Sequence, residues 1–241
     1  MRNLRPRDAM GLAALELRGA IITKADRAKG ARRIPGRMRL AGKVALVVGG
    51  SGGIGSATCR ALAAEGAAVA VHYGRSRGAA ESVVRDIEAA GGRAIALAAD
   101  VARKADAERL VAETIRALGG LDALVVCAGH PFHAEEWFAP YEDLPEAAFR
   151  RTFDVDLLGA VFVTQAVVPH FKTRREGKIV LVGSTPSITG DVAGITYLVA
   201  KAGVLALTRA LAQYLGPHNV HVNALALGAV ATPPMEALPA G

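Results

Sequence analysis

The feature that most constrains the fold is a regular alternation of strand-like and helix-like stretches from Lys43 onward. Short apolar stretches rich in Val, Ile, Leu and Ala are typical of buried strands, and longer stretches with apolar residues at helical spacing are typical of helices. Strands are predicted at 43–48, 68–72, 94–98, 121–126, 178–182 and 218–225, and helices at 56–65, 79–90, 104–118, 145–172 and 196–215. Helices that join successive strands indicate right-handed crossovers and a parallel sheet covered on both faces.

This pattern predicts an α/β chain with a doubly wound parallel sheet of Rossmann type, built from six strands. Its 241 residues are 51% apolar and 21% charged, which is a globular composition. No uninterrupted apolar run reaches the 18 residues typical of a membrane span, so we expect no membrane partner. The two cysteines, Cys59 and Cys127, are too few for a disulfide framework or a metal cluster, which favours a reduced, cytoplasmic setting.

The positive charge is confined to the start of the chain. Residues 1–40 contain 11 of the 29 Lys and Arg residues and 3 of the 22 Asp and Glu residues, so the remainder is nearly neutral. We therefore expect a basic, disordered extension at 1–40 and one folded domain at 41–241. An organellar transit peptide, a nucleic-acid-binding arm and sequence upstream of a natural start at Met38 are alternatives for the extension. The neutral domain itself argues against a nucleic-acid partner.

A glycine-rich turn follows the first predicted strand. It consists of Gly49, Gly50, Ser51, Gly52, Gly53, Ile54 and Gly55. Glycines between a strand and a helix let backbone amides approach a pyrophosphate, which then rests on the positive helix N-terminus. Directly after the first strand of a β-α-β unit, such a turn predicts a dinucleotide site.

The residues after the second predicted strand indicate which dinucleotide is bound. NAD-binding folds usually carry Asp or Glu here for the ribose hydroxyls, whereas this chain has Arg75, Ser76 and Arg77, and its first acid is Glu81. An arginine can pair with a 2′-phosphate, and no carboxylate repels it. The sequence therefore favours NADP over NAD, the alternative being that both arginines are solvated loop residues.

Three side chains suit a reaction on a carbonyl group. Tyr197 and Lys201 are four residues apart and share one helix face, while Ser184 follows the fifth predicted strand at the edge where parallel sheets bind ligands. A serine hydroxyl there can meet a tyrosine phenol across the crevice.

From about Leu40 to about Met235 the chain resembles the short-chain dehydrogenase/reductase family. Within that family it is most similar to the 3-oxoacyl-(acyl-carrier-protein) reductases and related carbonyl reductases. The resemblance rests on the glycine turn, on Ser184 followed by Tyr197-x-x-x-Lys201, and on the segments Asp100-Val101, Ala128-Gly129, Val222-Asn223-Ala224, Gly228 and Thr232-Pro233. It implies an NADP-dependent oxidoreductase that interconverts a ketone and a secondary alcohol, with a small-molecule substrate and assembly as a homodimer or homotetramer.

The resemblance also assigns roles to residues. Tyr197 would be the general acid and base, Lys201 would stabilise its phenolate and hold the nicotinamide ribose, and Ser184 would orient the substrate oxygen. Asp100 would contact adenine and Val230 would lie near the nicotinamide amide. The remaining cofactor contacts implied are Val101, Cys127, Ala128, Gly129, Gly228 and Thr232.

The chain departs from the family pattern at several positions. Asp156 occupies the place of the asparagine of the catalytic tetrad, and an ionised aspartate cannot donate hydrogen bonds and can pair with Lys201. Val48, Val126-Cys127 and Leu227 replace a threonine, two asparagines and a proline, and the chain stops before the lid and seventh strand usual in the family. These departures motivate an alternative, which is a non-catalytic dinucleotide-binding or scaffold protein or a truncated, inactive family member.

Two further groups of residues have open interpretations. His130, His133, Trp137 and Phe138 either line the substrate crevice or are solvated loop residues, and the two histidines have no third ligand for a metal. Phe153, Leu157, Val161 and Val168 either face another subunit or pack on the protein's own sheet.

Overall fold

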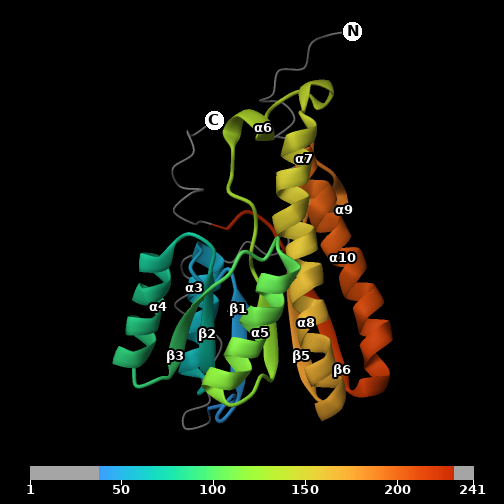
Figure 1. The fold of residues 1–241 in the computed structure, drawn as a ribbon. Helices are drawn as coiled ribbons and strands as arrows, with labels where there is room; N and C mark the ends of the chain where they lie inside the picture. Colours follow the sequence, from blue (N-terminus) through green and yellow to red (C-terminus); the bar gives the residue numbers. More distant parts are fainter. Residues whose placement is uncertain (1–37, 231–241) are drawn as a thin grey trace, which may run out of the picture. The chain divides into compact units, whose positions relative to one another are not determined.

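The computed structural model describes residues 38–230, which contain a parallel sheet of six strands. In chain order these are β1 (Val44–Val48), β2 (Ala68–Tyr73), β3 (Ala94–Ala98), β4 (Ala123–Val126), β5 (Gly177–Ser184) and β6 (Val220–Leu227). They lie in the order β3-β2-β1-β4-β5-β6, and each neighbouring pair is parallel (Figure 1). The chain builds outward from β1 in one direction and then from β4 in the other, so the predicted doubly wound sheet is confirmed.

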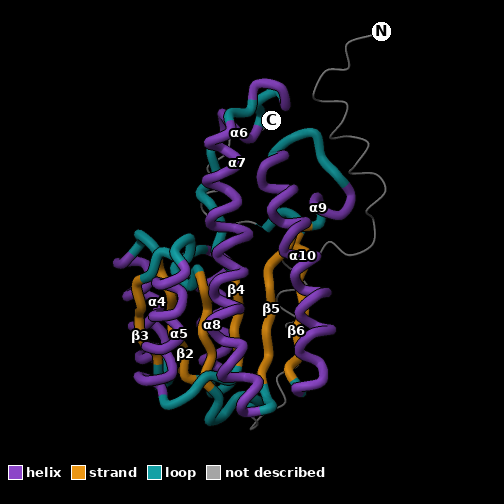
Figure 2. Tube along the Cα trace, turned by 45° about the vertical axis from the view of Figure 1, so that its right-hand side comes forward, coloured by secondary structure: helices purple, strands orange, loops and turns teal. Residues whose placement is uncertain are grey.

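Helices connect the strands. They are α3 (Gly53–Ala64), α4 (Arg77–Ala89), α5 (Lys104–Leu118), α6 (Ala134–Trp137), α7 (Glu146–Thr152), α8 (Gly159–Arg174), α9 (Pro186–Thr189) and α10 (Ile195–Leu215). Short 3-10 turns lie at η1 (Tyr141–Asp143) and η3 (Gly216–His218). The side chains of α3 and α4 pack on one face of the sheet, and those of α5, α8 and α10 pack on the other. Figure 2 shows α8 and α10 running along the strands, with α10 against β5 and β6.

The helix predicted at 145–172 is continuous but not uniformly α-helical. A π-helical turn, η2 (Phe153–Leu158), separates α7 from α8. A π turn adds a residue to the helical repeat and often marks a functional site. Asp156 lies in this turn and is 1% exposed, which is unusual for a residue with a carboxyl side chain. Gly159 follows it, where an added Cβ would lie 3.0 Å from a methyl carbon of Val101.

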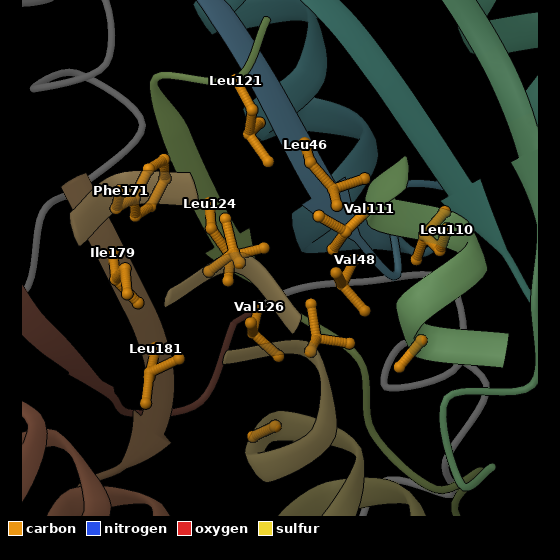
Figure 3. Packing of buried hydrophobic residues seen from close by; sticks show 14 of the residues in the cluster. Leu46, Val48, Leu110, Val111, Leu121, Leu124, Val126, Phe171, Ile179 and Leu181 are labelled. Atoms are coloured by element: carbon orange, nitrogen blue, oxygen red, sulfur yellow. The ribbon is translucent and has the colours of Figure 1, made fainter. Parts of the chain in front are cut away.

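The main core lies between β1, β4, β5 and the helices α5 and α8. Figure 3 shows the side chains of Leu46, Leu124, Ile179, Leu181 and Phe171 gathered there. All five are fully buried. Strands buried on both faces explain the continuous apolar runs in the sequence.

The ends of β5 and β6 differ from the sequence prediction. β5 extends to Ser184, because β6 pairs with it through Ser184 and Leu227. β6 begins at Val220, because residues 216–218 form the 3-10 turn η3. The side-chain pattern does not report either effect.

The predicted basic extension lies outside the described residues, apart from residues 38–40. Those three contact the domain: the backbone amide of Leu40 donates to the carbonyl of Glu65, and Arg39 pairs with the Glu65 carboxylate at 3.0 Å. The division of the chain at residue 40 otherwise stays a prediction.

Two described helical segments, Glu146–Arg174 and Ile195–His218, are long and apolar enough to cross a membrane by length and composition alone. Neither segment is an uninterrupted apolar run, because polar residues occur within both. The core helix of a soluble protein passes the same test, and here α8 packs on α5 and β5 while α10 packs on β5 and β6.

Candidate active site

The glycine turn joins the buried strand β1 to the N-terminus of α3. Gly49 has a φ of +78°, and an added Cβ would lie 2.7 Å from the backbone nitrogen of Ala128. At Gly55 an added Cβ would lie 2.1 Å from the Gly49 carbonyl oxygen, so α3 approaches the turn as only glycine allows. Gly52 caps α3 without a side-chain hydrogen bond. The first amides of α3 are therefore left for a phosphate, which fits a bound dinucleotide.

A buried histidine supports this turn from the neighbouring strand. His72 of β2 is 3% exposed; its Nδ1 accepts a hydrogen bond from the Gly49 amide at 2.9 Å, and its Nε2 lies 3.1 Å from the carbonyl oxygen of Ala99. These partners require a neutral ring with its proton on Nε2. Burial lowers the pKa of His72, against the opposing effects of the Ala99 carbonyl and the Asp100 charge. The sequence reasoning missed His72, although a histidine inside an apolar strand is a signal for a buried hydrogen-bonded role.

The end of β2 continues into the predicted 2′-phosphate region. Arg75 and Ser76 are exposed, and Ser76 caps α4 without a side-chain hydrogen bond. Arg77 instead pairs with Glu81 at 2.7 Å along α4. Of the two arginines, Arg75 is thus the better placed to meet an anion, because it makes no ion pair within residues 38–230.

The other predicted cofactor residues lie on three loops. Asp100 is exposed and its carboxylate accepts the Ala102 amide at 3.1 Å, while Val101 is buried against Gly159. Cys127, Ala128 and Gly129 follow β4, beside Gly49, and burial raises the pKa of the Cys127 thiol to about 11. Gly228 and Val230 follow β6, and Thr232 lies outside the described residues.

Ser184, Tyr197 and Lys201 come together at the carboxyl end of β5. Ser184 is the last residue of β5 and is 5% exposed, and the other two lie on α10. The Nζ atom of Lys201 lies 5.5 Å from the centre of the Tyr197 ring and 3.5 Å from the carbonyl oxygen of Ala128. Ser184 and Tyr197 line one cavity, whereas Lys201 is buried behind it.

Asp156 adds a negative charge to this group. Its Oδ2 lies 3.1 Å from Lys201 Nζ, an ion pair whose orientation is not that of a hydrogen bond. Its Oδ1 accepts the backbone amide of His130 at 2.5 Å. The π-helical turn thus directs a buried carboxylate at Lys201.

The cavity beside Ser184 and Tyr197 has a volume of about 350 Å³. Besides those two residues it is lined by His130, Pro131, Phe132, His133, Glu136, Trp137, Thr152, Pro186, Thr196, Leu198, Gly228 and Ala229. Both loop histidines and Trp137 therefore face the crevice, whereas Phe138 is 69% exposed and is not part of the lining. Glu136, Thr152 and Thr196 were missed, because only the fold brings them to the cavity.

Comparison with known proteins shows similarity to one family along most of the chain. The family model of short chain dehydrogenases matches residues 43–240. An L-rhamnose 1-dehydrogenase (NAD(P)(+)) of Sphingomonas sp. is 39% identical over 195 residues, 80% of this chain and 74% of that protein. A 3-oxoacyl-[acyl-carrier-protein] reductase of Synechocystis sp. is 37% identical over 199 residues, 83% of this chain and 78% of that protein.

A solved structure shares the fold. A short chain dehydrogenase from Burkholderia cenocepacia, crystallised in complex with NADP, superposes with a TM-score of 0.74 at 38% identity, covering 81% of this chain and 77% of that one. The sequence similarity and the order of the strands in the sheet indicate the same family. The chain belongs to the short-chain dehydrogenase/reductase family of oxidoreductases.

Proposed function

We propose that the protein is an NADP(H)-dependent oxidoreductase that interconverts a ketone, such as a 3-oxoacyl thioester or a similar carbonyl compound, and a secondary alcohol. The observation that carries the proposal is that Ser184 and Tyr197 line one cavity, with the Lys201 ammonium 5.5 Å from the tyrosine ring. This arrangement supplies a proton donor, a hydroxyl to orient an oxygen and a nearby positive charge.

In the reductive direction, Tyr197 Oη donates its proton to the substrate oxygen. A nicotinamide dinucleotide, when bound, would supply the hydride. Ser184 Oγ holds the substrate oxygen beside the phenol, and the Lys201 charge stabilises the phenolate that remains. In the oxidative direction, the phenolate takes the hydroxyl proton, and the hydride would pass from the alcohol carbon to the oxidised dinucleotide.

The glycine turn and the residues after β2 would hold the dinucleotide. The backbone amides at the start of α3, which no side chain caps, suit the pyrophosphate. Arg75 and Ser76, without an acidic neighbour, suit the 2′-phosphate of NADP. The NADP complex of the Burkholderia relative supports this preference, while the Sphingomonas relative is named for either dinucleotide.

The test is reduction of carbonyl compounds by NADPH and, separately, NADH. Replacing Tyr197→Phe removes only the hydroxyl, so we expect turnover to fall by at least about 10²-fold, the contribution typical of a general acid. Binding of NADPH, followed by its fluorescence, should be nearly unchanged. Tyr214→Phe is the matched control, because Tyr214 is exposed on the same helix and bonds only Lys172 among the described residues. Full activity in Tyr197→Phe would overturn the mechanism.

A non-catalytic dinucleotide-binding protein is the second candidate. The observation that favours it is the ion pair between Asp156 and Lys201, because a paired lysine gives less stabilisation to a phenolate. Binding of NADPH without turnover of any carbonyl compound would establish this alternative.

We further propose a cytoplasmic protein that assembles as a homodimer or homotetramer through the continuous helical segment of α7, η2 and α8 and through α10. Phe153, Leu157, Val161 and Val168 are half-buried, so each retains some surface for a partner. Leu157 and Val168 also pack against the protein's own core, which limits what they offer.

A further inference from the structure

The cavity beside Tyr197 provides almost no net charge for a ligand. Among the described residues that line it, the one Asp, Glu, Lys or Arg is Glu136, and its carboxylate pairs with Arg151 of α7. A carboxylate or phosphate on the substrate would therefore enter this space without a Lys or Arg of the described lining to pair with it.

His130 does not supply that cation. Burial lowers the pKa of His130, and the neighbouring His133 lowers it further, against the opposing effect of Asp156. The two rings lie 5.0 Å apart between centroids, where two positive charges would repel one another. At neutral pH, His130 is therefore a neutral hydrogen-bonding group.

Aromatic rings form one side of the cavity. The ring of Trp137 lies 5.2 Å from Phe132 and 5.4 Å from Tyr197, centre to centre. Its position is fixed from behind, because a Cβ on Gly194 would lie 2.8 Å from the indole and the Gly194 amide donates to the Trp137 carbonyl at 2.8 Å. A rigid indole next to the proton-donating phenol offers a flat apolar surface to whatever the phenol protonates.

We propose that the substrate is an uncharged carbonyl compound with an apolar ring, and that this ring packs against Trp137 and Phe132 while its oxygen meets Tyr197 and Ser184. This inference rests on the proposed function and narrows its substrate class. The aromatic wall selects the ring, and the absence of Lys and Arg from the described lining disfavours anionic analogues.

The experiment compares kcat/KM for matched compounds with the full-length protein and NADPH at pH 7.5. The first pair is methyl 4-oxocyclohexanecarboxylate against 4-oxocyclohexanecarboxylate, which differ by one charge. The second set is 2-tetralone against dihydroxyacetone and the N-acetylcysteamine thioester of 3-oxobutanoate. We expect the ester and the tetralone to be preferred by at least about tenfold, equivalent to about 1.4 kcal/mol.

Two substitutions assign the preferences to residues. Trp137→Ala should reduce the ratio of tetralone to dihydroxyacetone turnover by about tenfold, because the ring of the tetralone loses the indole surface on which it packs. A purely structural role of Trp137 would lower both rates and leave the ratio unchanged. Phe138→Ala is the neighbouring control, because Phe138 is 69% exposed and is not part of the lining.

Glu136→Gln removes the charge that neutralises Arg151. It should reduce the ester-to-acid ratio by about threefold, the size expected for a partly exposed charge. Glu146→Gln is its matched control. Glu146 pairs with Arg150 within α7, the helix that carries Arg151, but it does not line the cavity.

The outcomes separate the two levels of the argument. Turnover of the acid, of dihydroxyacetone or of the thioester at or above the rate of the ring compounds overturns the substrate inference and leaves the oxidoreductase intact. Unchanged ratios in Trp137→Ala overturn it as well. Absence of turnover with all five compounds and either nicotinamide dinucleotide would instead count against the proposed function.

Discussion

Asp156 occupies the position at which the resemblance to the family predicts the asparagine of the catalytic tetrad. Its side chain is fully buried, and it faces the Lys201 ammonium at 3.1 Å while accepting the His130 amide. A buried carboxylate this close to Lys201 weakens the positive electrostatic potential that the ammonium produces at Tyr197. The departure therefore bears on the pH dependence of the reaction.

Asp156→Asn should shift the pH–rate profile for alcohol oxidation to lower pH, by about one unit for each 1.4 kcal/mol of added phenolate stabilisation. The neutral amide no longer competes for Lys201, so turnover at neutral pH should rise. The measurement is kcat against pH for the parent and the variant. Thermal unfolding of both proteins checks that the variant remains folded.

A profile that keeps its position, or a folded variant slower than the parent at every pH, would mean that the carboxylate does not oppose the tyrosine.

At the scale of elements, His72 links the ends of three neighbouring strands. It belongs to β2, receives a hydrogen bond from Gly49 after β1, and bonds Ala99 after β3. The ring must be neutral to make both bonds, and its pKa is lowered by burial. The support of the glycine turn is therefore sensitive to acid.

The stabilisation from His72 should be complete above the ordinary histidine pKa of about 6.5 and should decline as the pH falls below it. In that range the unfolded chain binds a proton that the folded chain does not, which costs at most about 1.4 kcal/mol per pH unit. Denaturant unfolding at pH 7.5 and 5.5, for the parent and His72→Asn, measures the effect.

Comparison between the two proteins is needed because His130 and His218 also have lowered pKa values. The parent should lose more stability than the variant between the two pH values. Equal losses would show that His72 is not the group responsible.

For the whole molecule, stability depends on the core between β5 and α8. Phe171 is fully buried there, and a Cβ on Gly177 of β5 would lie 2.4 Å from its ring. Helix and strand thus approach closely because a glycine faces a phenylalanine. No small shift can fill the space if the ring is removed.

Phe171→Ala should lower the free energy of unfolding by about 3–5 kcal/mol, the usual cost of such a cavity. Phe138→Ala, at an exposed position, should change it by less than about 0.5 kcal/mol. Denaturant unfolding followed by far-ultraviolet circular dichroism compares the two variants. A loss below about 1 kcal/mol in Phe171→Ala would mean that the core relaxes around the cavity.

Local patterns were sufficient to predict the architecture. Apolar runs at 44–48 and 179–182 indicate strands, because a parallel strand buried on both faces admits few polar residues. The glycines from Gly49 to Gly55 indicate the turn, because only glycine tolerates its backbone angles and close approaches. Both signals depend on neighbouring residues, which the sequence displays directly.

Tertiary structure alone decided which distant residues meet. The bond between His72 and Gly49, the position of Trp137 beside Tyr197 and the place of Glu136 in the cavity join segments that are far apart or set by an irregular loop. Periodicity reports which face of an element is buried, but not what it faces. The π-helical turn that contains the buried Asp156 was likewise not predicted, because its residues also suit an ordinary α-helix.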